Sequence, residues 1–140
     1  MSSLILRTAA RYLIPLLILF SIYTLFRGHN QPGGGFAGGL LAATAFALYV
    51  FAWDADAARR AIRIDPHFLV GTGLFIALLS GLPGIITGGG FLTGKWIDVG
   101  IGIQKTAVGT PLIFDVGVYF VVIGATLMII LSLTQEEEKE

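Results

Sequence analysis

Four long apolar segments dominate the 140-residue sequence, and their length restricts its fold more than any other feature. The segments run from about Leu4 to Phe26, from Phe36 to Trp53, from Phe68 to Thr87 and from Pro111 to Leu133. A helix rises about 1.5 Å per residue, so about 20 apolar residues cross a hydrocarbon core about 30 Å thick. We therefore predict an all-α membrane protein: a single integral membrane domain, residues 1–140, with one transmembrane helix in each segment.

The composition agrees with this class and excludes several others. Hydrophobic residues make up 55% of the chain and charged residues only 13%, whereas a soluble domain has about 25% charged residues. The formal net charge is zero, so no basic surface indicates a nucleic-acid partner. The absence of cysteine excludes disulfides and thiolate zinc sites within this chain. We expect no catalytic residue, no cofactor and no metal site.

The first apolar segment is the least regular of the four. Arg7 and Arg11 lie four residues apart, and therefore on one helix face, from which both can reach the headgroups. The alternative is a cleavable signal peptide. That reading is weaker because no small-residue cleavage site follows Phe26 before the next turn.

Basic residues in the connecting loops predict the orientation of the chain in the membrane. With the N-terminus in the cytoplasm, the inner side carries six: Arg7, Arg11, Arg59, Arg60, Arg63 and Lys139. The outer side then carries three: Arg27, Lys95 and Lys105. Because cytoplasmic loops are enriched in Lys and Arg, we predict a multi-pass protein with both termini in the cytoplasm.

A glycine-rich outer segment, from Gly84 to Gly109, separates the third and fourth predicted helices. Its residues Trp96, Asp98 and Ile101 fall in a loosely alternating stretch, which makes them candidates for a short strand or hairpin. Pro83, just before this segment, is expected to end or bend the third helix.

Two polar stretches mark other helix boundaries. Thr110 and Pro111 suit the N-cap and the first position of the fourth helix. The inner loop "DADAARRAIRIDPHF" could hold a short amphipathic helix, with Asp65–Pro66 preceding the third transmembrane helix.

The triplet of glycines after Pro32 does not fit a nucleotide site. A phosphate-binding P-loop requires GxxxxGK followed by Ser or Thr, and no lysine follows Gly33 in this run. A dinucleotide fingerprint requires a βαβ unit. Here the glycines open an apolar helix of membrane length, which excludes that interpretation.

Small residues at helical spacing indicate close helix packing instead. In the second helix they recur every four residues, at Gly35, Gly39, Ala43 and Ala47. The third helix repeats the spacing at Gly73, Ala77 and Gly81. Membrane helices associate through close packing, which small residues permit. We therefore expect these ridges to dock helices within the chain and against partner subunits.

Two specific strings, "GHNQPGGGF" and "GTPLIFDVGVY", resemble the corresponding strings in the B subunit of Mrp-type multisubunit Na+/H+ antiporters, the MnhB/MrpB-like family. The resemblance covers nearly the whole chain, including "FLTGKW" in the outer segment. It implies an accessory subunit in a prokaryotic plasma membrane, packed between larger subunits of a complex that exchanges Na+ for H+. The partners implied are the large A and D type chains, the small C, E, F and G type chains, and membrane lipid.

Candidate functional residues lie in the two strings: His29, Asn30, Pro32, Gly33, Gly34, Gly35, Phe36 and Asp115. His29 could handle protons at the outer mouth or simply hold the loop by hydrogen bonds. Asn30 could offer an oxygen to a cation or satisfy the turn. Asp115 could attract a cation or balance a helix N-terminus. Pro32 and the glycines are expected to set a turn, and Phe36 to anchor packing between subunits.

Tyr119, Trp53 and Trp96 are expected to mark interfaces with headgroups or with neighbouring protein.

Two alternative functions remain open from the sequence. One is the equivalent membrane-arm subunit of an energy-converting hydrogenase-type complex, whose chemistry would lie in other chains. The other is a self-contained small transporter that forms homo-oligomers. Against the last stands the absence of any lysine or glutamate in the middle of a predicted helix.

Overall fold

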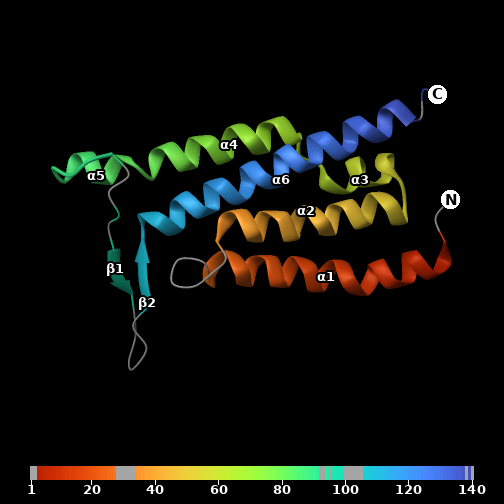
Figure 1. Cartoon of the computed structure of the whole chain (residues 1–140), viewed down its shortest axis with the longest axis horizontal. Helices are drawn as coiled ribbons and strands as arrows, with labels where there is room; N and C mark the ends of the chain where they lie inside the picture. Colours follow the sequence, from red (N-terminus) through yellow and green to blue (C-terminus); the bar gives the residue numbers. More distant parts are fainter. Residues whose placement is uncertain are drawn as a thin grey trace.

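The computed structural model describes residues 3–27, 34–91, 94, 96–99, 106–137 and 139. Its elements, in chain order, are α1 (Leu4–Arg27), α2 (Gly35–Ala52), α3 (Ala55–Ile62), α4 (Pro66–Leu79), α5 (Leu82–Ile86), β1 (Trp96–Val99), β2 (Thr106–Gly109) and α6 (Thr110–Glu137). The long helices run side by side, with both chain ends at one end of the molecule and the strands at the other (Figure 1).

Four helical segments are long and apolar enough to cross a membrane, which confirms the predicted fold class. They are Leu4–Arg27, Gly35–Ala52, Pro66–Ile86 and Thr110–Glu137. The first, second and fourth start within one residue of the predicted positions. The fourth extends beyond Leu133, because the polar C-terminal residues continue the helix as far as Glu137.

The third segment, predicted over residues 68–87 with an end or bend at Pro83, is divided into α4 and α5. The reason lies in Pro83. In a continuous helix the residue at this position would donate its N–H to the carbonyl of Leu79, but proline has no N–H and its ring crowds that carbonyl. Helix α4 accordingly ends at Leu79, and Gly81 precedes a new short helix that carries Pro83 in its first turn.

The predicted hairpin is present in the outer segment as an antiparallel pair, β1 and β2. The register places Trp96 opposite Gly109 and Val99 opposite Thr106. Ile101, the third residue expected in this hairpin, lies outside the described residues. The pair leads directly into α6.

The inner loop does contain a short amphipathic helix, α3. The side chain of Asp54 caps its N-terminus by accepting a bond from the Ala57 N–H, a common stabilising arrangement. Ala55 and Ala58 are buried against α2 and α6, while Arg60 is exposed to the outside. Helix α3 thus attaches its apolar side to the inner end of the bundle.

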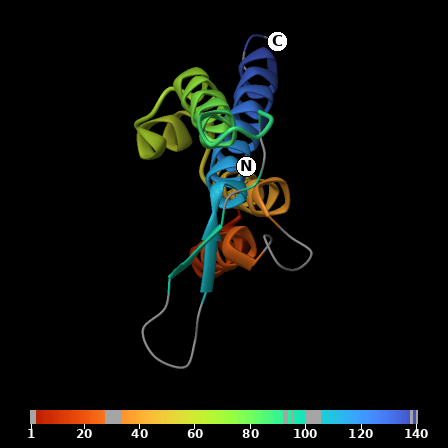
Figure 2. The same cartoon turned by 90° about the vertical axis from the view of Figure 1, so that its left-hand side faces the viewer.

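The transmembrane helices form a row in the order α1, α2, α6, α4 rather than a closed square bundle. Helix α6 packs against both α2 and α4, whereas α1 packs mainly against α2. The view from the strand end shows the same succession, with α3 to one side (Figure 2). A row leaves broad faces of the helices uncovered. In α1, for example, only 17% of the most apolar 18-residue stretch is buried within the chain.

Glycines in α2 allow it to approach a helix on each side. A Cβ atom at Gly38 would lie 2.9 Å from the Ser21 carbonyl oxygen of α1. One at Gly39 would lie 2.8 Å from Cβ of Val122 on α6. Real Cβ atoms do not come this close to other atoms. Helix α2 can therefore approach α1 and α6 at these points only because glycine has no side chain.

Helices α4 and α6 meet through a reciprocal glycine contact. A Cβ atom at Gly73 would lie 2.5 Å from the Gly117 carbonyl oxygen, and one at Gly117 would lie 2.6 Å from the Gly73 carbonyl oxygen. Ala77 adjoins the same contact, since its Cβ would be 3.0 Å from a Cβ at Gly117. Further along α6, Gly124 fits closely against Val70 and Pro66.

The remaining small residues of the predicted ridges have different surroundings. Ala43 is buried inside the chain, and Ala47 is half-buried. Gly81 lies beyond the end of α4, and a Cβ there would meet the ring of Phe91 rather than a transmembrane helix. The ridge of the third segment therefore contacts α6 only up to the break in that segment.

Candidate functional site at the start of α2

The start of α2 packs directly against Asp115 of α6. Gly34, which precedes α2, has a positive φ of 97°, a conformation that favours glycine. A Cβ atom there would lie 3.4 Å from Asp115 Oδ2 and 3.5 Å from Oδ1. At Gly35 a Cβ would overlap the backbone carbonyl of Asp115. Two of the glycines singled out in the sequence thus touch the acidic residue singled out in the other string.

This juxtaposition has an electrostatic reason. The N-terminus of a helix carries a partial positive charge and favours a nearby carboxylate, typically by about 0.3–1 kcal/mol near the surface. Helix α2 has no acidic residue in its own first turn. Asp115, which is 80 positions later in the chain than Gly35, places a carboxylate there instead.

The remaining predicted residues of the glycine-rich string are only partly covered by the structure. His29, Asn30, Pro32 and Gly33 lie outside the described residues, so their roles stay predictions. Phe36 is described, and its side chain is 62% exposed on the surface of the bundle.

A cavity of about 270 Å³ adjoins Asp115 where α4 ends and α6 begins. Its lining includes Ser80, Thr110, Pro111 and Phe114 together with Asp115. Oxygen-bearing side chains therefore line the cavity beside the break between α4 and α5. The C-terminal end of α4 also has partial negative charge, which favours a cation in its neighbourhood.

A polar junction between three helices was not predicted from the sequence. The Ser21 hydroxyl of α1, which is fully buried, donates to the Gly38 carbonyl of α2 at 2.7 Å. It also lies 2.8 Å from the Tyr119 hydroxyl of α6. Since serine has one proton and gives it to Gly38, Tyr119 donates to Ser21. The Tyr119 hydroxyl thus links α6 to α1 inside the bundle, while the interface role expected for its half-buried ring stays a prediction.

Removing this junction should weaken the bundle measurably. We expect Ser21→Ala and Tyr119→Phe each to lower the thermal stability of the purified chain. The double-mutant cycle should give a coupling energy of about 0.5–2 kcal/mol, the range for interhelical hydrogen bonds in membranes. Additive effects of the two substitutions would show that the hydroxyls do not interact.

The opposite end of the molecule carries two arginines that donate to backbone carbonyls of other helices. Arg7 Nε donates to the Ala52 carbonyl at the end of α2, at 3.0 Å. Arg59 donates to the Leu131 carbonyl near the end of α6, at 3.4 Å. A cation is favourable at the partly negative end of α2, whereas the Leu131 carbonyl lies six residues before the end of α6.

Comparison with known proteins agrees with this architecture. The family model described as "Domain related to MnhB subunit of Na+/H+ antiporter" matches residues 5–128. The B subunit of the Na+/H+ antiporter of Bacillus subtilis is 38% identical over 97% of this chain and 96% of its own length. The corresponding antiporter protein of Alkalihalophilus pseudofirmus is 37% identical over 97% of this chain and 95% of its own length.

A solved structure extends the likeness to three dimensions. One chain in the structure of the Mrp complex from Dietzia sp. DQ12-45-1b superposes with a TM-score of 0.78 and 40% sequence identity. The match covers 93% of this chain but only 14% of that chain, so the likeness is to one region of a much longer polypeptide. From the matching family model and the full-length relatives together, the chain belongs to the MnhB family, the B subunits of Na+/H+ antiporters.

Proposed function

We propose that this chain is an accessory subunit of a multisubunit monovalent-cation/proton antiporter, in which it packs between larger subunits. The support is its likeness to antiporter B subunits over nearly the full length of both sequences. We further infer a location in a prokaryotic plasma membrane, with both termini in the cytoplasm. The partners are large A and D type chains and small C, E, F and G type chains, in contact with membrane lipid.

The observation that carries the packing role is the open row of helices. The small residues of α2, α4 and α6 mostly contact other helices of the same chain. Large apolar side chains instead cover the outer helices, with Leu19 of α1 68% exposed and Phe75 of α4 61% exposed. Phe36 belongs to the same exposed set. Partner subunits therefore dock on these large side chains, while the glycine ridges set the internal spacing.

The chain also contributes to the cation path at its outer end, by this proposal. Asp115 offers a carboxylate beside a cavity with the side chains of Ser80 and Thr110. In transporters, the C-terminal ends of broken helices often coordinate cations, and α4 ends beside this cavity. The rest of the path, and the proton-carrying charges, belong to the larger chains.

Purification through an affinity tag on this chain tests the proposal. We expect several membrane proteins of antiporter type to co-purify, and Na+/H+ exchange in vesicles made from cells that contain the whole set. Recovery of a homo-oligomer alone would contradict an accessory role. Recovery with a hydrogenase large subunit and ferredoxin-like chains would assign the chain to a different complex.

A further inference from the structure

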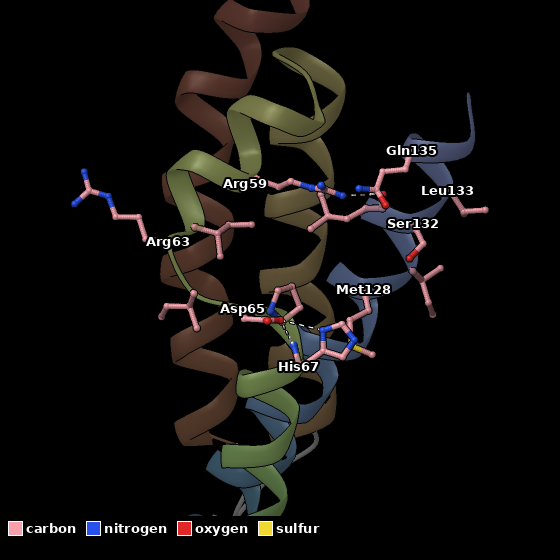
Figure 3. A pocket seen from close by; sticks show the side chains of 13 residues that line it. Arg59, Arg63, Asp65, His67, Met128, Ser132, Leu133 and Gln135 are labelled. Atoms are coloured by element: carbon pink, nitrogen blue, oxygen red, sulfur yellow. Dashed lines mark hydrogen bonds and ion pairs between the residues drawn. The ribbon is translucent and has the colours of Figure 1, made fainter. Parts of the chain in front are cut away.

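A second and larger cavity lies at the end of the molecule away from Asp115. Its volume is about 860 Å³, within the range of about 300–1,000 Å³ typical of small-molecule sites. It is bounded by α3, by the link from α3 to α4, and by the last turns of α6. Figure 3 shows Arg59 of α3 reaching toward Gln135 of α6, with Asp65, His67 and Met128 further along the cavity.

Arg59 places a positive charge at this cavity, and the groups that accept its hydrogen bonds are neutral. Its guanidinium donates to the Leu131 carbonyl. With the Gln135 amide oriented so that its oxygen faces the arginine, two further bonds form at 2.7 and 2.6 Å. Arg63, which also lines the cavity, extends away from Arg59 in Figure 3. Neither arginine has a carboxylate within ion-pair distance in the part of the chain that the structure describes.

Asp65, the acidic residue of the lining, is engaged by its own helix. Its carboxylate accepts a bond from the His67 N–H at 2.9 Å and so caps α4. It also lies 2.9 Å from Nδ1 of the His67 ring. These two hydrogen bonds, the backbone one foremost, hold the pKa of Asp65 below its ordinary value. The carboxylate therefore stays charged and bound to the start of α4, and it forms no ion pair with Arg59.

The rest of the cavity wall is apolar. Ile62 of α3 and Met128, Ile129 and Leu133 of α6 line it. Ile129 is 61% exposed and Leu133 is 59% exposed, so apolar surface continues outward along α6. A small inorganic anion would leave this surface uncovered. An amphiphile would satisfy both parts, with an anionic head at Arg59 and hydrocarbon along the apolar wall.

We propose that this cavity binds an anionic phospholipid, whose phosphate group contacts the guanidinium of Arg59 and whose glycerol and acyl chains follow the apolar face of α6. Basic pockets between membrane helices on the cytoplasmic side are suited to such headgroups. The positively charged loops put this end of the chain in the inner leaflet, where anionic lipids gather. The site requires that the chain spans a membrane with this end in the inner leaflet, and it is independent of the antiporter assignment.

The experiment uses the tagged chain together with all subunits that it retains, in nanodiscs of phosphatidylcholine. A photoactivatable phosphatidylglycerol is added, and labelled peptides are identified by mass spectrometry. We expect labelling of the α6 peptide that contains Met128 and Ser132, and competition by unlabelled phosphatidylglycerol but not by phosphatidylcholine. Arg59→Gln should reduce this labelling to the level of a phosphatidylcholine probe. Arg60→Gln, which makes the same charge change next door but outside the lining, should leave it intact.

A second variant keeps the test decisive if Arg59→Gln loosens α3 from α6. Ser132→Trp places a large ring in the cavity from an exposed position and leaves Arg59 unchanged. It should abolish labelling while the chain stays in its complex. Equal labelling in Arg59→Gln and Arg60→Gln, or no preference for phosphatidylglycerol, would overturn the proposal. So would cross-linking of this cavity to a partner protein in place of lipid.

Discussion

Gly73→Leu should remove this chain from the membrane, whereas Gly71→Leu should leave it at its normal level. The two glycines lie two residues apart on α4, and both are in a helical conformation. At Gly73 even a Cβ atom would lie 2.5 Å from the Gly117 carbonyl oxygen and 2.8 Å from Cγ2 of Val121. A Cβ atom at Gly71 would have no described heavy atom within 4 Å apart from its chain neighbours and the backbone of its own helix.

The difference between these variants follows from what the new side chain meets. Leucine at position 73 meets the backbone of α6, which cannot rotate away, so the helices must separate. Overpacking of this kind typically costs about 1–3 kcal/mol, and loss of the neighbouring contacts adds to that cost. Leucine at position 71 instead improves helix propensity by up to about 1 kcal/mol.

Immunoblots of isolated membranes and thermal melting of the purified chain would measure both effects. Equal abundance and equal melting temperature of the two variants would show that α4 and α6 do not meet through Gly73 and Gly117.

Asp115→Asn should abolish most cation exchange by the complex while leaving its assembly unchanged. The substitution keeps the size and shape of the side chain but removes the charge beside the outer cavity. A cation at about 4 Å from a carboxylate interacts with it by about 4 kcal/mol at an effective dielectric constant of about 20. A loss of about 1.4 kcal/mol already lowers affinity about tenfold.

The measurement is Na+-dependent proton movement in inverted vesicles, alongside co-purification of the complex through a tag on this chain. Asp56→Asn is the matched control, since it removes one exposed carboxylate from α3 at the other end of the chain. Normal exchange in Asp115→Asn would refute the transport role. Loss of the complex in this variant would assign Asp115 to holding the start of α2 instead.

Local features of the fold could be predicted well from the sequence. Membrane-length apolar segments specify spans because each helix satisfies its own backbone in lipid. The effect of Pro83 could be anticipated because it acts on the carbonyl four residues earlier, and alternation around Trp96 indicated the hairpin. Helix boundaries are set mainly by residues close to them in the sequence, so they can be predicted from one sequence alone.

Contacts between distant segments could not be predicted. Ser21 reads as an ordinary polar residue within an apolar helix, and nothing near it indicates a bond to Tyr119, 98 positions away. For Asp115 the sequence suggested a cation or a helix N-terminus as its partner, but nothing in it indicated that the residue lies beside Gly34 and α2. The ridge of small residues on α2 predicted close packing, but only the arrangement of the helices shows that α1 and α6 occupy that surface.

Electron cryomicroscopy of the complex purified through this chain would show which surfaces of its helices the partner subunits contact. We expect Gly39 to lie against Val122 of the same chain in the assembly, as it does here. We also expect partner proteins to contact the large apolar side chains of α1 and α4. A partner helix seated on Gly39 and Ala43, with α6 displaced from them, would contradict this arrangement.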